Sequence, residues 1–260
     1  MQRIERIRKA VEGAVADSLL DALDNASPDA KALGRTLSTA TLINATALVH
    51  QTIRDHLSPK VIEMCSLASL KGDPRGLDGV LSSLAALLDT ACLGQLSKHS
   101  SGLKVVEVCL FPEVVEALSG LKDLASPGNP ALFHKRYLDS MKFLTNLERR
   151  IALKSSIDAF RESEDYKKFL ALWNLPVYFQ IRHQEIGLVV ESSLCEEAGL
   201  RLVGAGTLPA FVGPDAVSGQ VLHSTVGVLR GLAQCWQHDV YLPPLLHRWV
   251  LLNFFYDSIS

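Results

Sequence analysis

The side chains in this sequence that could do chemistry are its histidines, and their spacing fits no catalytic or metal-binding pattern. None stands in a His-Glu-x-x-His motif, which would place two zinc ligands and a general base on one helix face. His183 and Glu185 are only two positions apart, so they diverge on a helix. For His247, beside Arg248 in an apolar context, we expect a hydrogen-bonded structural role rather than catalysis. The histidines are His50, His56, His99, His134, His183, His223, His238 and His247.

Two other patterns could belong to a binding site, but neither matches one well. Gly204-Ala-Gly-Thr-Leu-Pro209 begins like a dinucleotide-binding loop, but Pro209 takes the place of the third glycine, and neither a preceding strand nor a following helix is predicted. Trp173 and Trp236 each lie at the end of a predicted helix and are expected to anchor its packing. The sequence contains no P-loop, no GxSxG motif and no Cys/His nucleophile signature. We therefore predict no catalytic residue, no cofactor-binding residue and no metal site.

The composition is that of a globular protein of one or two domains without a nucleic-acid-binding surface. Of its 260 residues, 48% are hydrophobic and 21% are charged, with a net charge of −2, whereas nucleic-acid binding needs clustered Lys and Arg. The longest uncharged run, 36–53, is too polar to span a membrane, and acidic residues near the N-terminus exclude a secretory signal. The cysteines are odd in number and form no CxxC pair, which indicates reduced, buried thiols. They are Cys65, Cys92, Cys109, Cys195 and Cys235.

A capping residue followed directly by proline recurs along the chain and predicts where helices begin. The first residue can accept a hydrogen bond from the first turn, and proline suits the first helical position. The pairs are Ser27-Pro28, Ser58-Pro59, Asp73-Pro74 and Asn129-Pro130. Apolar residues at helical spacing then predict helices over 3–22, 28–55, 59–70, 77–96, 104–124, 130–150, 156–172, 177–191, 221–236 and 243–256. The β-branched residues near Val105 would also fit a strand, but we prefer a helix bent or restarted near Pro112, because no partner strand is visible.

These elements predict an all-α fold, an elongated array of antiparallel helices that form helical bundles. A break rich in Pro and Gly at 125–130 divides the array into two segments, 1–125 and 126–260, and residues 199–219 are expected to form a long loop. The helix over 177–191 is apolar around most of its circumference, so we expect it to be buried between neighbours. Its narrow solvated edge is formed by Gln180, His183, Gln184 and Glu191.

Several short segments of the sequence, which we call family-like words, resemble the conserved oligomeric Golgi (COG) complex subunit 2 family. The words are Phe111-Pro-Glu113, Ser126-Pro-Gly-Asn-Pro130, Phe133-His134 with Tyr137, Ser140-Met-Lys-Phe143, Leu147-Glu-Arg149, Trp173-Asn-Leu-Pro-Val-Tyr-Phe-Gln-Ile-Arg182, Gln184-Glu-Ile186, Cys235-Trp236, Leu242-Pro243 and His247-Arg248. Their order and rough spacing also match that family over about 105–249. Residues 1–104 resemble it only in helical character and position.

The resemblance implies a non-enzymatic, helical-rod subunit of a multisubunit vesicle-tethering complex on the cytosolic face of the Golgi membrane. Such subunits support retrograde intra-Golgi transport and Golgi glycosylation homeostasis through protein–protein contacts. The implied partners are the other subunits of the complex, with SNAREs, Rab GTPases and golgins as further expected partners. Membrane association is expected to be peripheral and mainly indirect, with unassembled protein in the cytosol. The resemblance implies no cofactor and no catalytic residue.

The sequence departs from the family pattern at both ends. It lacks the N-terminal coiled-coil region through which family members assemble, and residues 250–260 replace the expected continuation of a helix after Trp249, so we expect a fragment or an alternatively spliced product. The residues alone also fit two other functions. One is a helical-repeat adaptor unrelated to Golgi traffic, although no repeat of about 34–47 residues is visible. The other is an all-α enzyme whose site is built from scattered residues.

Overall fold

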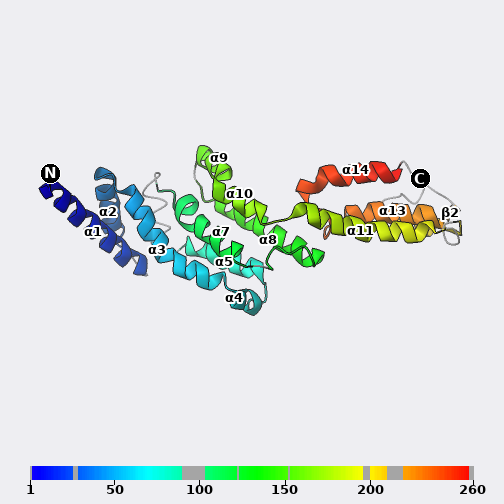
Figure 1. The fold of residues 1–260 in the computed structure, drawn as a ribbon, viewed down its shortest axis with the longest axis horizontal. Helices are drawn as coiled ribbons and strands as arrows, with labels where there is room; N and C mark the ends of the chain where they lie inside the picture. Colours follow the sequence, from blue (N-terminus) through cyan, green and yellow to red (C-terminus); the bar gives the residue numbers. More distant parts are fainter. Residues whose placement is uncertain are drawn as a thin grey trace. The chain divides into compact units, whose positions relative to one another are not determined.

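The computed structural model of the chain describes residues 2–25, 29–89, 103–121, 123–151, 153–195, 200–209 and 219–257. Within these ranges helices predominate (Figure 1), and the only strands form one two-stranded sheet. The prediction of an all-α helical-bundle fold is confirmed. The chain forms two compact units, the first made of Met1–Leu124 and Arg136–Trp173 and the second of Ala125–Lys135 and Asn174–Ser260. The division of the sequence at residue 125 stays a prediction.

The first unit begins with a predicted helix and continues with shorter helices than the sequence suggested. Its elements before residue 125 are α1 (Gln2–Asp24), α2 (Ala30–Leu42), α3 (Thr46–Met64), α4 (Leu67–Gly72), α5 (Leu77–Leu87), the π-helix η1 (Val105–Leu110) and α7 (Phe111–Ser119). The helix predicted over 3–22 is confirmed as α1. Of the helix predicted over 77–96, the part after residue 89 lies outside the described residues.

The single helix predicted over 28–55 is wrong, because Asn44 interrupts it. Asn44 has a φ of 59°, a left-handed conformation that asparagine tolerates better than most residues. The amides of Ile43 and Ala45 donate to the carbonyls of Thr39 (3.0 Å) and Ala40 (2.8 Å), which closes the end of α2 before α3 begins. The side chain of Asp29 caps α2 by accepting from the amide of Lys31. The predicted start at Ser27-Pro28 lies outside the described residues.

Pro59 was predicted to begin a helix, but it lies inside α3. The apolar stripe formed by Ile53, Leu57 and Val61 continues past the proline and is fully buried. Burial of these side chains offsets the cost of proline in a helix interior, which is about 3 kcal/mol. The helix predicted over 59–70 is therefore wrong, and α4 begins later, where Ser66 accepts a hydrogen bond from the amide of Ser69 (3.2 Å).

The segment after residue 103 is helical, as predicted, and not a strand. The π-helix η1 passes directly into α7, which begins at Phe111 with Pro112 in its first turn. The predicted restart near Pro112 is therefore confirmed. Four aromatic and aliphatic side chains of α7 are buried, and they set this helix into the core of the first unit. They are Phe111, Val114, Val115 and Leu118.

Helices α8 (Pro130–Glu148), α9 (Lys154–Glu162) and α10 (Glu164–Ala171) follow. The predicted cap at Asn129 is confirmed, since its Oδ1 accepts from the amide of Leu132 at 3.0 Å. By contrast, the pair Asp73-Pro74 forms a turn, and α5 begins three residues later. The helix predicted over 156–172 is split at Ser163, whose extended backbone ends α9 and whose hydroxyl caps α10 at the amide of Tyr166 (3.2 Å).

The second unit is built around α11 (Leu175–Leu194), which starts as predicted. The side chain of Asn174 accepts from the amide of Val177, and Pro176 occupies the first turn. The remaining elements are β1 (Leu202–Gly204), the 3₁₀ helix η2 (Ala205–Thr207), β2 (Gln220–Leu222), α13 (His223–Cys235), the 3₁₀ helix η3 (Pro243–Leu245) and α14 (Leu246–Asp257). Strands β1 and β2 pair antiparallel inside the predicted loop region. Residues 210–218 of that loop lie outside the described part.

The expected burial of α11 on most sides is wrong for its C-terminal half. Tyr178, Ile186 and Val190 are buried along one stripe, whereas Leu188 is 67% exposed and Val189 is partly exposed. The buried stripe faces α13, and Figure 1 shows the two helices side by side. Because α11 packs against α13 along one face, other apolar side chains of α11 lie on the surface of this chain.

Two glycines of α13, Gly227 and Gly231, permit the close approach of α11. A Cβ added at Gly227 would overlap the side chain of Ser193, and one at Gly231 would lie 2.6 Å from Cγ2 of Val190. The helices can approach this closely only without side chains at both positions. Ser193 itself is buried and donates to the carbonyl of Val190 (2.6 Å), so it has little freedom to move away.

We expect Gly227→Ala to destabilise the second unit by about 1–3 kcal/mol, because the added methyl group forces α13 away from α11. The matched control is Gly13→Ala in α1, where nothing lies within 4 Å of the added atom. The control should be neutral or stabilising by up to about 1 kcal/mol, since alanine favours a helix over glycine. Urea unfolding with peptide-resolved hydrogen exchange measures both. Equal effects of the two substitutions would contradict the close packing of α13 against α11.

Candidate protein-interaction site

The histidines and other residues that were weighed for chemistry are dispersed through the described parts of both units. Among the residues that the structure describes, no group of three or more His, Cys, Asp and Glu side chains could hold a metal ion. His247 lies exposed on α14, and Arg248 stacks over the ring of Phe179 with 5.5 Å between its Cζ and the ring centroid. His99 lies outside the described residues.

The glycine-rich segment at Gly204 differs from its prediction in one respect. A strand does precede it, since β1 ends at Gly204 and η2 follows. That strand has three residues and pairs antiparallel with β2, whereas a dinucleotide site needs a parallel strand that runs into a helix. Of the two tryptophans, Trp173 is buried against Tyr137 at 5.7 Å between ring centroids, as a packing anchor would be. Trp236 is 46% exposed.

The family-like words of the second unit meet at one turn, where three side chains hold three successive backbone carbonyls. His134 donates from Nε2 to the carbonyl of Tyr241 (3.0 Å), and the hydroxyl of Tyr178 donates to that of Val240 (2.7 Å). Arg182 donates to the carbonyl of Asp239 (3.1 Å). We call these three donors and the carbonyls of 239–241 the carbonyl clasp. It fixes the turn between α13 and η3 to α11 and to the start of α8.

Packing reinforces the carbonyl clasp around Tyr178, which is fully buried. The ring of Phe133 stacks on that of Tyr178 with 5.1 Å between centroids, and Arg182 lies over its face at 5.7 Å. Burial raises the pKa of Tyr178, so its hydroxyl stays protonated and remains a donor. The three donors of the carbonyl clasp therefore serve the fold, since each binds a backbone carbonyl.

Phe111, the first residue of one family-like word, lies in an aromatic cluster with Phe160, Tyr166 and Phe169. The ring of Phe111 lies 4.8 Å from that of Phe160 and 5.6 Å from that of Phe169, measured between centroids. Rings in such tilted or edge-on arrangements attract each other beyond their burial. The cluster joins α7, α9 and α10 into one core.

Glu148 closes the edge of the aromatic cluster through two polar contacts. Arg161 donates two hydrogen bonds to the carboxylate of Glu148 (2.8 and 2.6 Å), and the hydroxyl of Tyr166 donates a third at 3.3 Å. The hydrogen bonds from Arg161 lower the pKa of Glu148. Its contribution to stability is therefore present above its unfolded-state pKa and is lost as the pH falls through the lower folded-state value.

Three of the four cysteines in the described residues are buried, as the sequence predicted. Burial raises the pKa of Cys65 and Cys109 to about 12 and that of Cys235 to about 11. Cys195, at the end of α11, is exposed. Cys92 lies outside the described residues.

Among these four thiols, iodoacetamide at neutral pH is expected to modify Cys195 first. The reagent attacks the thiolate, and burial both suppresses thiolate formation and blocks access at the other three sites. Peptide mass spectrometry of the native protein over time measures the order, and the same protein in urea serves as the control in which all four react. Modification of Cys109 as fast as that of Cys195 would contradict the buried arrangement.

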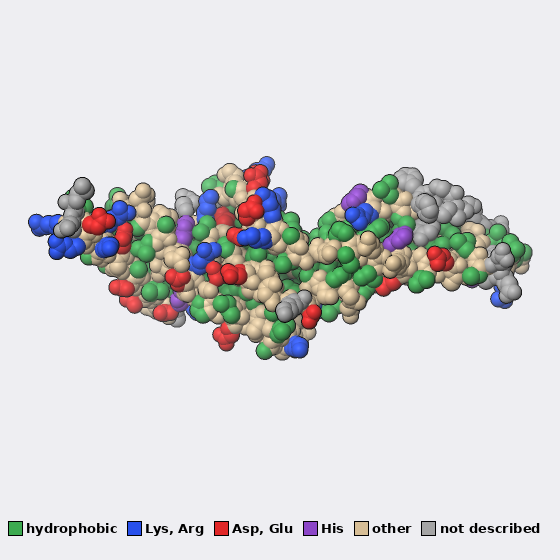
Figure 2. All heavy atoms as spheres, in the orientation of Figure 1, with side chains coloured by type: hydrophobic (Ala, Val, Ile, Leu, Met, Phe, Trp, Pro, Cys, Tyr) green, Lys and Arg blue, Asp and Glu red, His purple; other side chains and the backbone are tan. Residues whose placement is uncertain are grey.

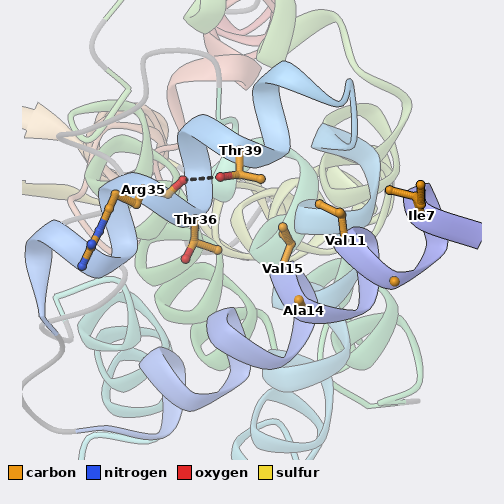
Figure 3. A pocket seen from close by; sticks show the side chains of 8 residues that line it. Ile7, Val11, Ala14, Val15, Arg35, Thr36 and Thr39 are labelled. Carbon is orange, nitrogen blue, oxygen red and sulfur yellow. Dashed lines mark hydrogen bonds between the residues drawn. The ribbon is translucent and has the colours of Figure 1, made fainter. Parts of the chain in front are cut away.

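On the first unit, α1 and α2 leave a groove between them, with a volume of about 450 Å³ (Figure 3). Its walls are mainly apolar: Ile7, Val11 and Val15 project from α1, opposite Thr36 and Thr39 of α2. The inner end is narrow, because Val15 is buried. The outer end is open to solvent, since residues 3–10 of α1 are exposed along their whole length. This groove is a concave, mainly apolar surface of the kind that can bind another molecule.

Within the residues that the structure describes, no helix has both the length and the apolar character that crossing a bilayer requires.

Comparison with known proteins connects the carbonyl clasp with one family. Residues 171–254 match the family model described as COG complex component, COG2, C-terminal. This range contains two of the three clasp donors, Tyr178 and Arg182, and all three carbonyls. No solved structure matches the chain at a significant level.

Full-length relatives give the same result over more of the chain. Conserved oligomeric Golgi complex subunit 2 of Homo sapiens is 29% identical over 217 residues, which cover 79% of this chain and 27% of the human protein. The protein of the same name from Drosophila melanogaster is 25% identical over 249 residues, covering 90% of this chain and 33% of the relative. That from Arabidopsis thaliana is 31% identical over 153 residues, covering 55% and 19%. The chain thus spans a third or less of the length of these relatives, and over most of its own length it is similar to the conserved oligomeric Golgi complex subunit 2 family.

Proposed function

We propose that this chain acts as part of a non-enzymatic subunit of the COG complex, a vesicle tether on the cytosolic face of the Golgi membrane. In this role it supports retrograde intra-Golgi transport and thereby keeps Golgi glycosylation in balance. It works by holding other proteins through helix surfaces. The relatives carry this complex in their names, and the helical fold of the described residues supplies surfaces of the required kind.

The observation that carries the proposal is the exposure of large apolar side chains on helices of both units. In the first unit Ile4 is 74% exposed and Leu42 is 86% exposed, and in the second Leu188 is 67% exposed. Apolar side chains at a helix surface bind well when another helix covers them. The polar side chains of the carbonyl clasp, in contrast, are used within the fold.

The proposed partners are the other subunits of the COG complex, with SNAREs, Rab GTPases and golgins as further partners of the assembled tether. Association with the Golgi membrane is then peripheral and runs mainly through these proteins, and unassembled protein is cytosolic. This assignment needs no catalytic residue and no cofactor.

The proposal predicts that the affinity-tagged chain, expressed in cells, co-purifies with the other COG subunits. Quantitative mass spectrometry of the purified material measures their recovery. The tagged human subunit 2 in the same cells is the positive control, and a tagged Tyr178→Ala variant, expected to lose the second unit, is the negative one. Recovery of no other subunit with a folded chain, while the human control recovers them, would overturn the proposal.

A further inference from the structure

The groove between α1 and α2 combines an apolar floor with a positively charged surround. Over residues 2–12 of α1, four basic residues (Arg3, Arg6, Arg8 and Lys9) stand against two acidic ones (Glu5 and Glu12), and α2 contributes Arg35 to the lining of the groove. The surroundings of the groove therefore hold five basic and two acidic side chains, an excess of three positive charges on a chain whose net charge is −2. Figure 2 shows Lys and Arg side chains gathered at the end of the first unit where α1 begins.

Arg35 lies at the edge of the groove, whose other lining side chains carry no charge. In Figure 3, Arg35 is on α2 beside the groove, with its guanidinium directed away from Val11 and Val15. Arg8 pairs with Glu12 at 2.9 Å, one turn further along α1. An apolar strip bordered by charges is the arrangement that a helix of a bundle or coiled coil presents to a partner helix.

The apolar strip is prolonged beyond the groove by side chains that no neighbour in the described residues covers fully. Ile4 is 74% exposed, Ile7 57% and Leu42 86%. A second hollow beside α2 is lined by Leu42 and by the opposite charges of Asp29 and Lys31, and it shares Arg35 and Thr39 with the groove. One continuous surface therefore runs from α1 across to the outer face of α2. Its large aliphatic side chains are of the kind that anchor an interface when they are buried.

We propose that this surface binds an acidic amphipathic helix of another protein in the assembly. This inference rests on the proposed function and names the chemistry of one partner. The helix lays its apolar face between α1 and α2, and its Glu and Asp side chains lie near Arg3 and Arg35. A concave groove suits the ridge of a helix better than a flat bilayer, and Glu5 and Glu12 oppose phosphate groups. This chain's own residues 90–102 carry Lys98 and no acid, so they lack the matching charge.

The test places a photo-crosslinking benzoylphenylalanine at Ile7 of the full chain within the co-purified complex. Cross-linked peptides should come from another protein, from a segment with apolar residues at helical spacing and a net negative charge. In the same chain, Arg35→Glu should reduce the cross-linking yield several-fold, and added salt should reduce it as well, because opposite charges at the rim attract the partner. The same crosslinker at Leu188, which is exposed on the second unit, is the matched control and should not respond to Arg35→Glu.

Several results would overturn the inference. One is a cross-link from position 7 to lipid, to nucleic acid, to a second copy of this chain or to its own residues 90–102. Another is a cross-link to a segment without net negative charge. A third is the absence of cross-links in a complex that still co-purifies. Recovery of a complex without these cross-links separates the two proposals. It supports the proposed function and contradicts only the helix partner. If no other subunit is recovered, both proposals fail. Binding to vesicles of phosphatidylcholine and phosphatidylserine that is lost in Ile7→Asp would favour a membrane and overturn the helix partner.

Discussion

Phe111→Ala is expected to lower the free energy of unfolding of the first unit by about 3–5 kcal/mol, the usual range for deleting a buried phenylalanine ring. The ring is fully buried and lies within 6.2 Å of three other aromatic rings, measured between centroids. Its removal leaves a cavity where α7, α9 and α10 meet. Because a small unit has a total stability of only about 5–15 kcal/mol, the change should be visible as a loss of cooperative unfolding.

Hydrogen exchange, followed peptide by peptide, shows where the loss occurs. In Phe111→Ala, protection should fall in α7, α9 and α10, while peptides of α11 and α13 keep theirs. The control is Leu67→Ala in α4, whose side chain is 55% exposed and whose loss should change stability by no more than about 0.5 kcal/mol. A similarly small effect of Phe111→Ala would mean that the aromatic cluster does not hold the first unit.

The second large effect is expected in the other unit, where Tyr178→Ala should cost about 3–5 kcal/mol for the lost ring. The substitution removes the stacking on Phe133 and the hydrogen bond to the carbonyl of Val240 together. Tyr178→Phe separates the two contributions, because it keeps the ring and deletes only the hydroxyl. We expect it to cost about 1–3 kcal/mol, the penalty for a buried hydrogen-bonding group left without its partner.

Denaturant unfolding of both Tyr178 variants, with hydrogen exchange across α11, α13 and the turn at 239–241, measures these effects. Tyr178→Phe should release the turn selectively, so the amides near 240 should exchange faster while the amides of α8 beyond residue 136 keep their rates. The exposed neighbour Gln180→Ala is the matched control and should be nearly neutral. Equal stability of Tyr178→Phe and the unaltered protein would show that the carbonyl clasp contributes little.

Local signals in the sequence predicted the helices well where a side chain acts on its own backbone. Asn129 was predicted to cap a helix and does so within three residues of itself, so the sequence around it contains all the partners involved. Asn174 caps α11 in the same way but was not among the predicted caps. The break at Asn44 escaped the prediction because asparagine is also found within helices, and only its left-handed φ reveals it. Pro59 shows the opposite case, in which tertiary burial of one stripe overrides a strong local breaker.

The candidate interaction site was less accessible to prediction, since it depends on partners far apart in the sequence. The donors of the carbonyl clasp lie 107, 62 and 57 positions from the carbonyls they hold, and residue type alone cannot identify a backbone carbonyl as a partner. The resemblance to the family singled out the segments that contain these donors, but it did not indicate which groups their side chains bind. The groove was missed because the apolar positions of α1 look the same whether they face the core or solvent. The structure shows that Ile4 and Ile7 are largely exposed.

If the proposed function holds, this helical chain acts by joining subunits of the COG complex. Sedimentation velocity on a mixture of the purified chain with the remaining purified COG subunits tests it most directly, with Phe111→Ala and Tyr178→Ala chains as folding-deficient controls. The account predicts that the unaltered chain moves into a single faster-sedimenting species containing the other subunits, and that neither control does so. A folded chain that sediments alone at every subunit concentration tested would contradict the account.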